Sequence, residues 1–169
     1  MIVRRETKKD YDEIYYLIKE AFAQAEHSDG TEQDLAAALR ESAAFVPELA
    51  LVAELDGKIA GHIMFSEANV GEDTVLVLAP LSVLPEFQKK GVGSALIKEA
   101  HRIARELGYQ YCLVLGSENY YPRFGYLPAK EFGVEVPEGM PSENFMAVKL
   151  CDSAKEICGS VKYAEEFGI

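Results

Sequence analysis

The sequence contains no tryptophan, only three cysteines and no long apolar run. Cys112, Cys151 and Cys158 are an odd number in a chain of 169 residues, which fits free thiols in a reducing compartment and excludes a disulfide-stapled secreted domain. The N-terminal segment lacks the apolar stretch of about seven residues that a signal peptide requires, and no segment approaches the roughly 18 apolar residues of a membrane span. We therefore expect a soluble protein of the cytoplasm.

Positive charge is also scarce. The chain has 17 Lys+Arg against 28 Asp+Glu, a formal net charge of -11. Nucleic acid and anionic membranes bind clustered positive charge, so this balance argues against either as the main partner. A cationic small molecule or a basic peptide suits the charge better.

The length and the 49% hydrophobic content demand no more than one hydrophobic core. We expect a single domain over residues 1–169. Its core spans about residues 2–150, and residues 151–169 form a polar C-terminal tail packed on that core.

The first half of the chain alternates short strands with helices. Residues 2–6 predict a strand, and a helix follows because four apolar residues share one helical face: Ile14, Leu17, Ile18 and Phe22. Residues 32–40 predict a second helix. The pair Asp56-Gly57, between two apolar runs, predicts a hairpin with a type I′ turn.

The second half opens with an apolar segment, residues 74–84, which predicts a central strand that Pro80 kinks or bulges. The period then changes, and one face of a predicted helix carries Val92, Leu96, Ala100, Ile103 and Leu107. Residues 111–116 predict a buried strand, and residues 132–136 and 144–150 a closing strand pair. Strands with helices inserted singly predict a mixed α/β sheet.

The bend between strand and helix, "QKKGVGS", is typical of an anion site. A helix N-terminus presents unpaired N–H groups and partial positive charge. Gly91 and Gly93 would let an anion approach this backbone, Gln88 can donate an amide hydrogen bond, and Lys89 and Lys90 add positive charge. We expect the bend to bind a phosphate or pyrophosphate, although the lysines could instead be ordinary surface charge.

Two common phosphate-binding motifs do not fit this bend. The chain has no GxxxxGKS or GxxxxGKT sequence, and Leu96 stands where a dinucleotide fingerprint has its third glycine. The QxxGxG spacing between a central strand and an amphipathic helix instead resembles motif A of the GCN5-related N-acetyltransferases, the GNAT family. The resemblance covers about residues 2–150 in element order. It implies an α/β (α+β) fold: a mixed, mostly antiparallel twisted sheet of about seven strands flanked by helices, with one splayed strand pair.

The resemblance also implies where acetyl-CoA binds. Leu81, Ser82 and Val83 stand where the family's bulged fourth strand contacts the pantetheine arm, through the main chain of Leu81 and Val83. The pyrophosphate would lie on the bend and the first helical turn, which comprise Gln88, Lys89, Lys90, Gly91, Val92, Gly93 and Ser94. No metal is implied.

A second segment, "YYPRFGY", resembles the end of the family's motif B and most resembles its YhbS-like bacterial subfamily. Tyr121 takes the place of a tyrosine that protonates the leaving CoA thiolate, which a phenol of pKa about 10 can do for a thiolate of pKa about 8.5. The packing alternative for Tyr121 is one aromatic among nine tyrosines. An asparagine of many family members falls here at Val114, and Asn119 is an open candidate to replace it.

The general base is open, because the predicted fourth strand has no Asp, Glu or His. Glu67, His62 and a water chain past Ser82 are the candidates, with a structural role favoured for His62. Glu26, His27 and Asp29 resemble a metal trio only superficially, since such loop clusters are usually solvated. Cys112 is expected in the core.

The resulting hypothesis is an acetyl-CoA-dependent N-acetyltransferase with direct transfer to a primary amine. The amine acceptor would enter between residues 25–31 and the closing strands, where acidic residues favour a cation. A CoA-binding sensor or interaction module without transfer activity is the alternative. A homodimer and acyl groups longer than acetyl are further open alternatives.

Overall fold

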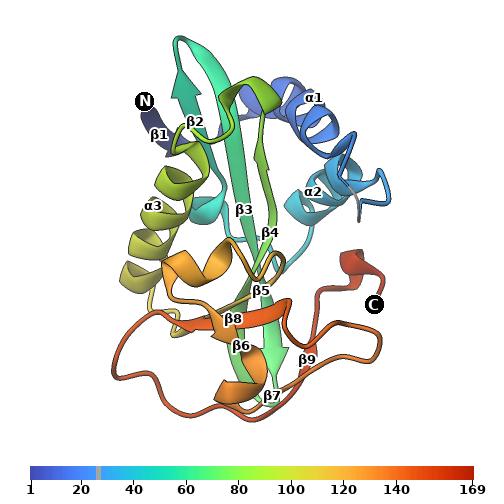
Figure 1. The fold of residues 1–169 in the computed structure, drawn as a ribbon, viewed down its shortest axis with the longest axis vertical. Helices are drawn as coiled ribbons and strands as arrows, with labels where there is room; N and C mark the ends of the chain where they lie inside the picture. Colours follow the sequence, from blue (N-terminus) through green and yellow to red (C-terminus); the bar gives the residue numbers. More distant parts are fainter. Residues whose placement is uncertain (26–27) are drawn as a thin grey trace.

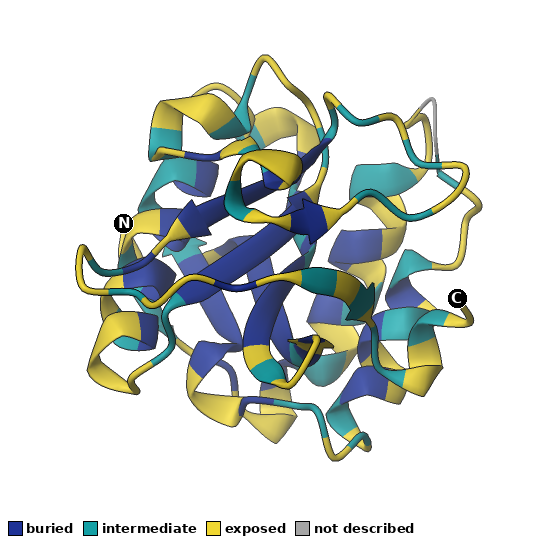
Figure 2. Ribbon diagram, turned by 90° about the horizontal axis from the view of Figure 1, so that it is seen from below, coloured by how far each residue is buried: buried dark blue, intermediate teal, exposed yellow. Residues whose placement is uncertain are grey.

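The computed structural model describes residues 1–25 and 28–169. A mixed sheet lies between α1 (Tyr11–Phe22) and α2 (Glu32–Arg40) on one side and α3 (Val92–Glu106) on the other (Figure 1). Side chains from the sheet pack against α3 in one apolar cluster and against α1 and α2 in another. Figure 2 shows the buried strands at the centre, with exposed residues on the outer faces of the helices and in the loops.

The sheet order is β1-β2-β3-β4-β5-β8-β6, with β7 and β9 attached at the side. The strands of the first half are β1 (Ile2–Arg5), β2 (Leu51–Leu55), β3 (Lys58–Val70) and β4 (Asp73–Val83). Those of the second half are β5 (Tyr111–Leu115), β6 (Leu127–Pro128), β7 (Val134–Glu135), β8 (Phe145–Lys149) and β9 (Gly159–Lys162). Neighbours along the order are antiparallel except β4 and β5, which confirms the predicted mixed, mostly antiparallel sheet.

The local predictions for the hairpin, the break at Pro80 and the end of α3 are confirmed. β2 and β3 form a hairpin whose turn residues, Asp56 and Gly57, have φ angles of 55° and 77°. The break at Pro80 is a bulge: Ile63 of β3 lies opposite Leu81, and Phe65 lies opposite Leu78, so β4 carries one extra residue there. α3 ends as predicted near Gly108, which has a φ of 91°. Leu107 was predicted on the apolar face of this helix, but it follows the end of α3 and 41% of it is exposed.

The predicted closing strand pair is wrong. β8 pairs with β5 and with β6, whereas β7 pairs with β9 of the C-terminal tail. Gly133, with a φ of 83°, ends a short 3-10 helix (Ala129–Phe132) and leaves only two extended residues after it. The tail therefore does more than pack on the core: β9 also extends the sheet beside β3.

Candidate functional site

A cavity of about 890 Å³ opens where β4 and β5 diverge. Their parallel ladder consists of only two pairs, Leu76 with Cys112 and Val77 with Leu113. Beyond it, the ends of both strands line the cavity, together with the N-terminus of α3, the 3-10 helix η4 (Tyr121–Phe124) and residues of α1 and α2. The splayed strand pair that the family resemblance implies is thus the opening of this cavity.

Nine of the twelve predicted site residues line this cavity. They are Leu81, Val83, Gln88, Lys89, Gly91, Val92, Gly93, Ser94 and Tyr121. Ser82, Lys90 and Asn119 are not among the described lining residues. Ser82 alternates to the other face of β4 and is buried opposite His62, the Lys90 ammonium lies 5.7 Å from the ring centroid of Phe87, and Asn119 is exposed in a turn.

The backbone at the start of α3 is arranged to accept an anion. Gly91 is the N-cap residue with a φ of 84°, and the residue two before it, Lys89, has a φ of 61°. The first intrahelical bond runs from the Ala95 N–H to the Gly91 carbonyl at 3.0 Å. The three preceding amides, of residues 92–94, therefore have no intrahelical acceptor and are available to a ligand in the cavity.

The two glycines of the bend have different surroundings. A Cβ at Gly91 would meet no atom within 4 Å, so the space over this residue is open to the cavity. A Cβ at Gly93 would overlap the hydroxyl of Tyr120. Gly91 therefore leaves room for an anion at the backbone, which was expected of both glycines. Gly93 instead leaves room for the side chain of Tyr120, the N-cap residue of η4.

Tyr121 lines the cavity as part of an aromatic cluster. Its ring makes edge contacts with Tyr120 and Tyr126, at centroid distances of 5.1 Å and 5.6 Å, and packs against Gly116 at the end of β5. Burial, with a smaller contribution from Tyr120, raises the pKa of the Tyr121 phenol above its ordinary value of 10. The phenol therefore stays protonated at neutral pH and can donate a hydrogen bond or a proton.

Sequence reasoning missed several lining residues, of which Arg123 and Glu32 carry charge. The Arg123 guanidinium lies 4.5 Å from the Tyr120 ring centroid, and its Nε–H donates to the Tyr120 carbonyl at 3.3 Å. Its position two residues after Tyr121 in "YYPRFGY" was the available signal. Glu32 comes from α2, and nothing in the sequence linked it to the bend.

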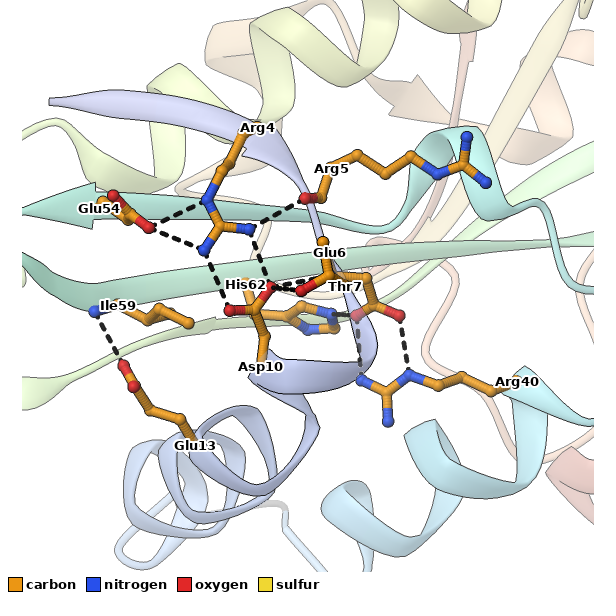
Figure 3. Close-up of polar contacts among 10 residues, drawn as sticks. All are labelled: Arg4, Arg5, Glu6, Thr7, Asp10, Glu13, Arg40, Glu54, Ile59 and His62. Carbon is orange, nitrogen blue, oxygen red and sulfur yellow. Dashed lines mark hydrogen bonds and ion pairs between the residues drawn. The ribbon is translucent and has the colours of Figure 1, made fainter.

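The three candidates for a general base lie outside the described lining of the cavity. His62 is wholly buried under α2, where its Nε2–H donates to Glu6 at 2.9 Å and Arg40 binds the other Glu6 oxygen at 2.8 Å (Figure 3). Burial lowers the pKa of His62, so the ring is neutral in this network. Glu67 accepts a hydrogen bond from the Tyr109 hydroxyl at 2.6 Å, and Ser82 faces away from the cavity.

Two further findings bear on ligands. The described residues include no group of three His, Cys, Asp or Glu side chains arranged to bind a metal, and the trio of Glu26, His27 and Asp29 lies partly outside those residues, at positions 26–27. No described helix combines the length and apolar character needed to cross a bilayer. Cys112 is buried in the core as expected, and burial raises the pKa of its thiol to about 12.

Comparison with known proteins identifies a family. The model of the Acetyltransferase (GNAT) family matches residues 11–126. The Escherichia coli K12 protein YjhQ, described as an uncharacterized N-acetyltransferase, is 39% identical over 142 residues, which cover 79% of this chain and 78% of YjhQ. YhbS of the same strain, described in the same way, is 32% identical over 171 residues, which cover 99% of this chain and 98% of YhbS.

Solved structures agree with the sequence relatives. A GNAT family acetyltransferase from Brucella melitensis in complex with acetyl-CoA has a TM-score of 0.82 and 31% identity, covering 98% of this chain and 97% of that one. E. coli YhbS in complex with CoA has a TM-score of 0.88 and 27% identity, covering 99% of this chain and 92% of that one. The shared fold extends over the whole chain, including its C-terminal tail.

Proposed function

The chain belongs to the GNAT family of acetyltransferases, and on this premise we propose that it moves an acetyl group directly from acetyl-CoA to a primary amine of a small molecule or peptide. The proposal comprises one catalytic domain over residues 1–169, acting in the cytoplasm. It includes no metal, nucleic acid or membrane.

One observation carries the proposal: the free amides of residues 92–94 and the open space over Gly91 face the same cavity as the diverging ends of β4 and β5. A pyrophosphate needs the amides and the positive end of α3. An extended pantetheine arm needs backbone groups on the side of β4 that faces β5, and beyond the end of the β4–β5 ladder β5 leaves this side of Leu81 and Val83 unpaired. The relatives from E. coli and B. melitensis were solved with CoA and acetyl-CoA.

Charged groups around the bend support the same ligand. Lys89 and Arg123 line the cavity and offset the overall charge of -11 locally. The Gln88 side-chain amide donates to the Val83 carbonyl at 3.3 Å, so in this arrangement it joins the bend to the strand end. We therefore assign Gln88 a positioning role beside its predicted contact with phosphate.

In the proposed reaction a neutral amine forms the new C–N bond while the C–S bond to CoA breaks. Backbone N–H groups at the β4 bulge stabilise the oxygen that gains negative charge. Tyr121 donates its phenolic proton to the leaving sulfur, and the proton that the amine loses passes to solvent and returns to Tyr121. Because burial raises the pKa of this phenol, full proton transfer to the CoA thiolate, whose conjugate thiol has a pKa of about 8.5, is uphill, so the proton moves in concert with C–S cleavage.

A sensor that binds CoA without turnover is the second candidate. It is favoured by the position of His62, Glu67 and Ser82, none of which lines the cavity in the described residues. The two functions differ in one observable, which is the release of free thiol in the presence of an amine.

The experiment mixes the protein with acetyl-CoA and a panel of polyamines, amino sugars, aminoglycosides and basic peptides, and follows free thiol. We expect release that depends on an acceptor, and a fall in kcat of about 100-fold in Tyr121→Phe because the proton donor is lost. Tyr120→Phe is the matched control, because it removes the neighbouring hydroxyl and should retain most activity. Tight acetyl-CoA binding without turnover on any acceptor would establish the sensor instead.

A further inference from the structure

The charged side chains of the cavity are separated by sign. Among the described lining residues, the cations are Lys89 and Arg123, on the bend before α3 and on η4. The anion is Glu32, in the first turn of α2. α2 and α3 pack on opposite faces of the sheet (Figure 1), so Glu32 and the first turn of α3 line the cavity from helices on opposite faces.

We propose that the Glu32 carboxylate binds a positive charge of the acceptor and selects acceptors that carry a second cationic group besides the amine that is acetylated. This inference rests on the proposed function, which places the cofactor at the α3 end. It goes beyond that function by naming the residue and the charge that set acceptor specificity.

The carboxylate is held in place by its own loop. The Ser28 hydroxyl donates to Glu32 Oε1 at 2.7 Å, and Ser28 Oγ accepts the Gly30 N–H at 3.0 Å. Gln33 donates from its side-chain amide to the Gly30 carbonyl at 2.9 Å. These bonds fix the first turn of α2, so an incoming cation meets a carboxylate that has already lost much of its side-chain freedom.

The surroundings of Glu32 suit an alkyl chain with a charged end. Phe22 of α1 and Leu35 of α2 also line the cavity and are partly buried. In the described part of the chain, no arginine or lysine forms an ion pair with Glu32. A half-buried carboxylate beside apolar walls binds a cation more strongly than a fully exposed one, because water screens the pair less.

The bound charge cannot be the attacking nitrogen itself. A nearby carboxylate raises the pKa of an amine and so opposes the deprotonation that attack requires. Glu32 therefore suits a second cationic group, at a distance from the reacting amine. This requirement selects diamines, polyamines, aminoglycosides and basic peptides over monoamines.

The test titrates the CoA-saturated protein with spermidine and with butylamine in a calorimeter. We expect the wild type to bind spermidine about ten times more tightly than butylamine, and Glu32→Gln to lose that preference. Glu20→Gln is the matched control, because Glu20 is an exposed carboxylate of α1 outside the cavity lining, and the change in net charge is the same. Glu20→Gln should keep the preference.

Three results would overturn the inference: a preference unchanged in Glu32→Gln, an equal loss in both variants, or no binding of spermidine to the wild-type CoA complex. For a dicationic amine that the protein acetylates, Glu32→Gln should raise KM about tenfold and leave kcat and the affinity for CoA unchanged. If the wild type binds CoA and acetylates amines but Glu32→Gln does not raise KM, only the assignment of Glu32 is contradicted. A wild type that does not bind CoA contradicts both proposals.

Discussion

At the scale of single residues, two buried histidines make stability depend on pH. His62 lies within the Glu6 and Arg40 network, and the His101 ring of α3 is 2.9 Å from the Tyr126 hydroxyl. Burial lowers the pKa of both, that of His101 to about 4 with a further contribution from Arg105. Both rings are therefore neutral in the folded protein at neutral pH.

Stability should fall as the pH drops below 6.5. In that range the unfolded chain protonates these histidines and the folded protein does not, so their contribution is complete above pH 6.5, their ordinary pKa, and falls at lower pH; that of His101 is lost as the pH falls through about 4. Each histidine should cost up to about 1.4 kcal/mol per pH unit in this window. Urea unfolding at pH 7.5, 6.5 and 5.5 measures the slope.

Variants assign the slope to its source. His62→Gln and His101→Gln should each lower the slope of unfolding free energy against pH by up to about 1.4 kcal/mol per pH unit, which corresponds to one proton. This change in slope does not depend on their effect on stability at pH 7.5. A slope that both variants leave unchanged would mean that neither ring is kept neutral in the folded state.

Two glycines of the bend show which roles of single residues can be predicted from the sequence. The access that Gly91 gives was predictable, because a glycine before a helix start has no Cβ to keep an anion from the backbone; its φ of 84° is a finding of the structure. The role of Gly93 was not predictable, because it depends on Tyr120, which lies 27 positions later in the chain and packs against the first turn of α3. Contacts of this kind have no local signature.

At the scale of elements, ionic contacts tie α2 and α1 to the sheet. Arg40 of α2 binds Glu6, which follows β1, with two hydrogen bonds of 2.8 Å and 3.0 Å (Figure 3). On the same side, Arg4 of β1 binds both Asp10 and Glu54. Because Glu32 belongs to α2, the position of this helix also sets one wall of the cavity.

Removing Arg40 should destabilise the fold strongly. Arg40→Leu leaves the Glu6 carboxylate buried with only His62 beside it, and breaking a buried pair in this way costs about 3 kcal/mol. Arg102→Leu is the control, since Arg102 is 54% exposed and binds two carboxylates of α3, a surface arrangement worth at most about 1 kcal/mol. Denaturant unfolding of both variants measures the difference, and equal losses would contradict it.

Elements were predictable where the signal is local and long. The hairpin at Asp56-Gly57, the bulge at Pro80 and the apolar face of α3 each follow from a few neighbouring residues. The pairing of β7 with β9 was missed because each contributes only two residues to the ladder and their partners are far apart in the chain. Such short ladders are specified by packing rather than by alternation.

At the scale of the whole molecule, the cavity is assembled from segments that the chain brings together only on folding. The side of the cavity at the start of α3 was predictable, because the end of β4, the bend and the first turn of α3 are contiguous and one motif contains their lining residues. Arg123 and Glu32 were not predicted, because each comes from a separate element. The net charge of -11 favours a cationic partner but singles out no carboxylate of the chain.

The central claim is that the amides at the start of α3 bind the pyrophosphate of CoA, and calorimetry of CoA binding to two variants of Gly91 tests it most directly. Asp and Asn both tolerate the positive φ of 84° at this position and differ in charge. We expect both variants to weaken CoA binding, because either side chain fills the open space over Gly91, and Gly91→Asp to bind CoA about tenfold more weakly than Gly91→Asn, because its charge also repels the phosphates. No heat of CoA binding to the wild type, or equal affinities for the two variants, would contradict the account.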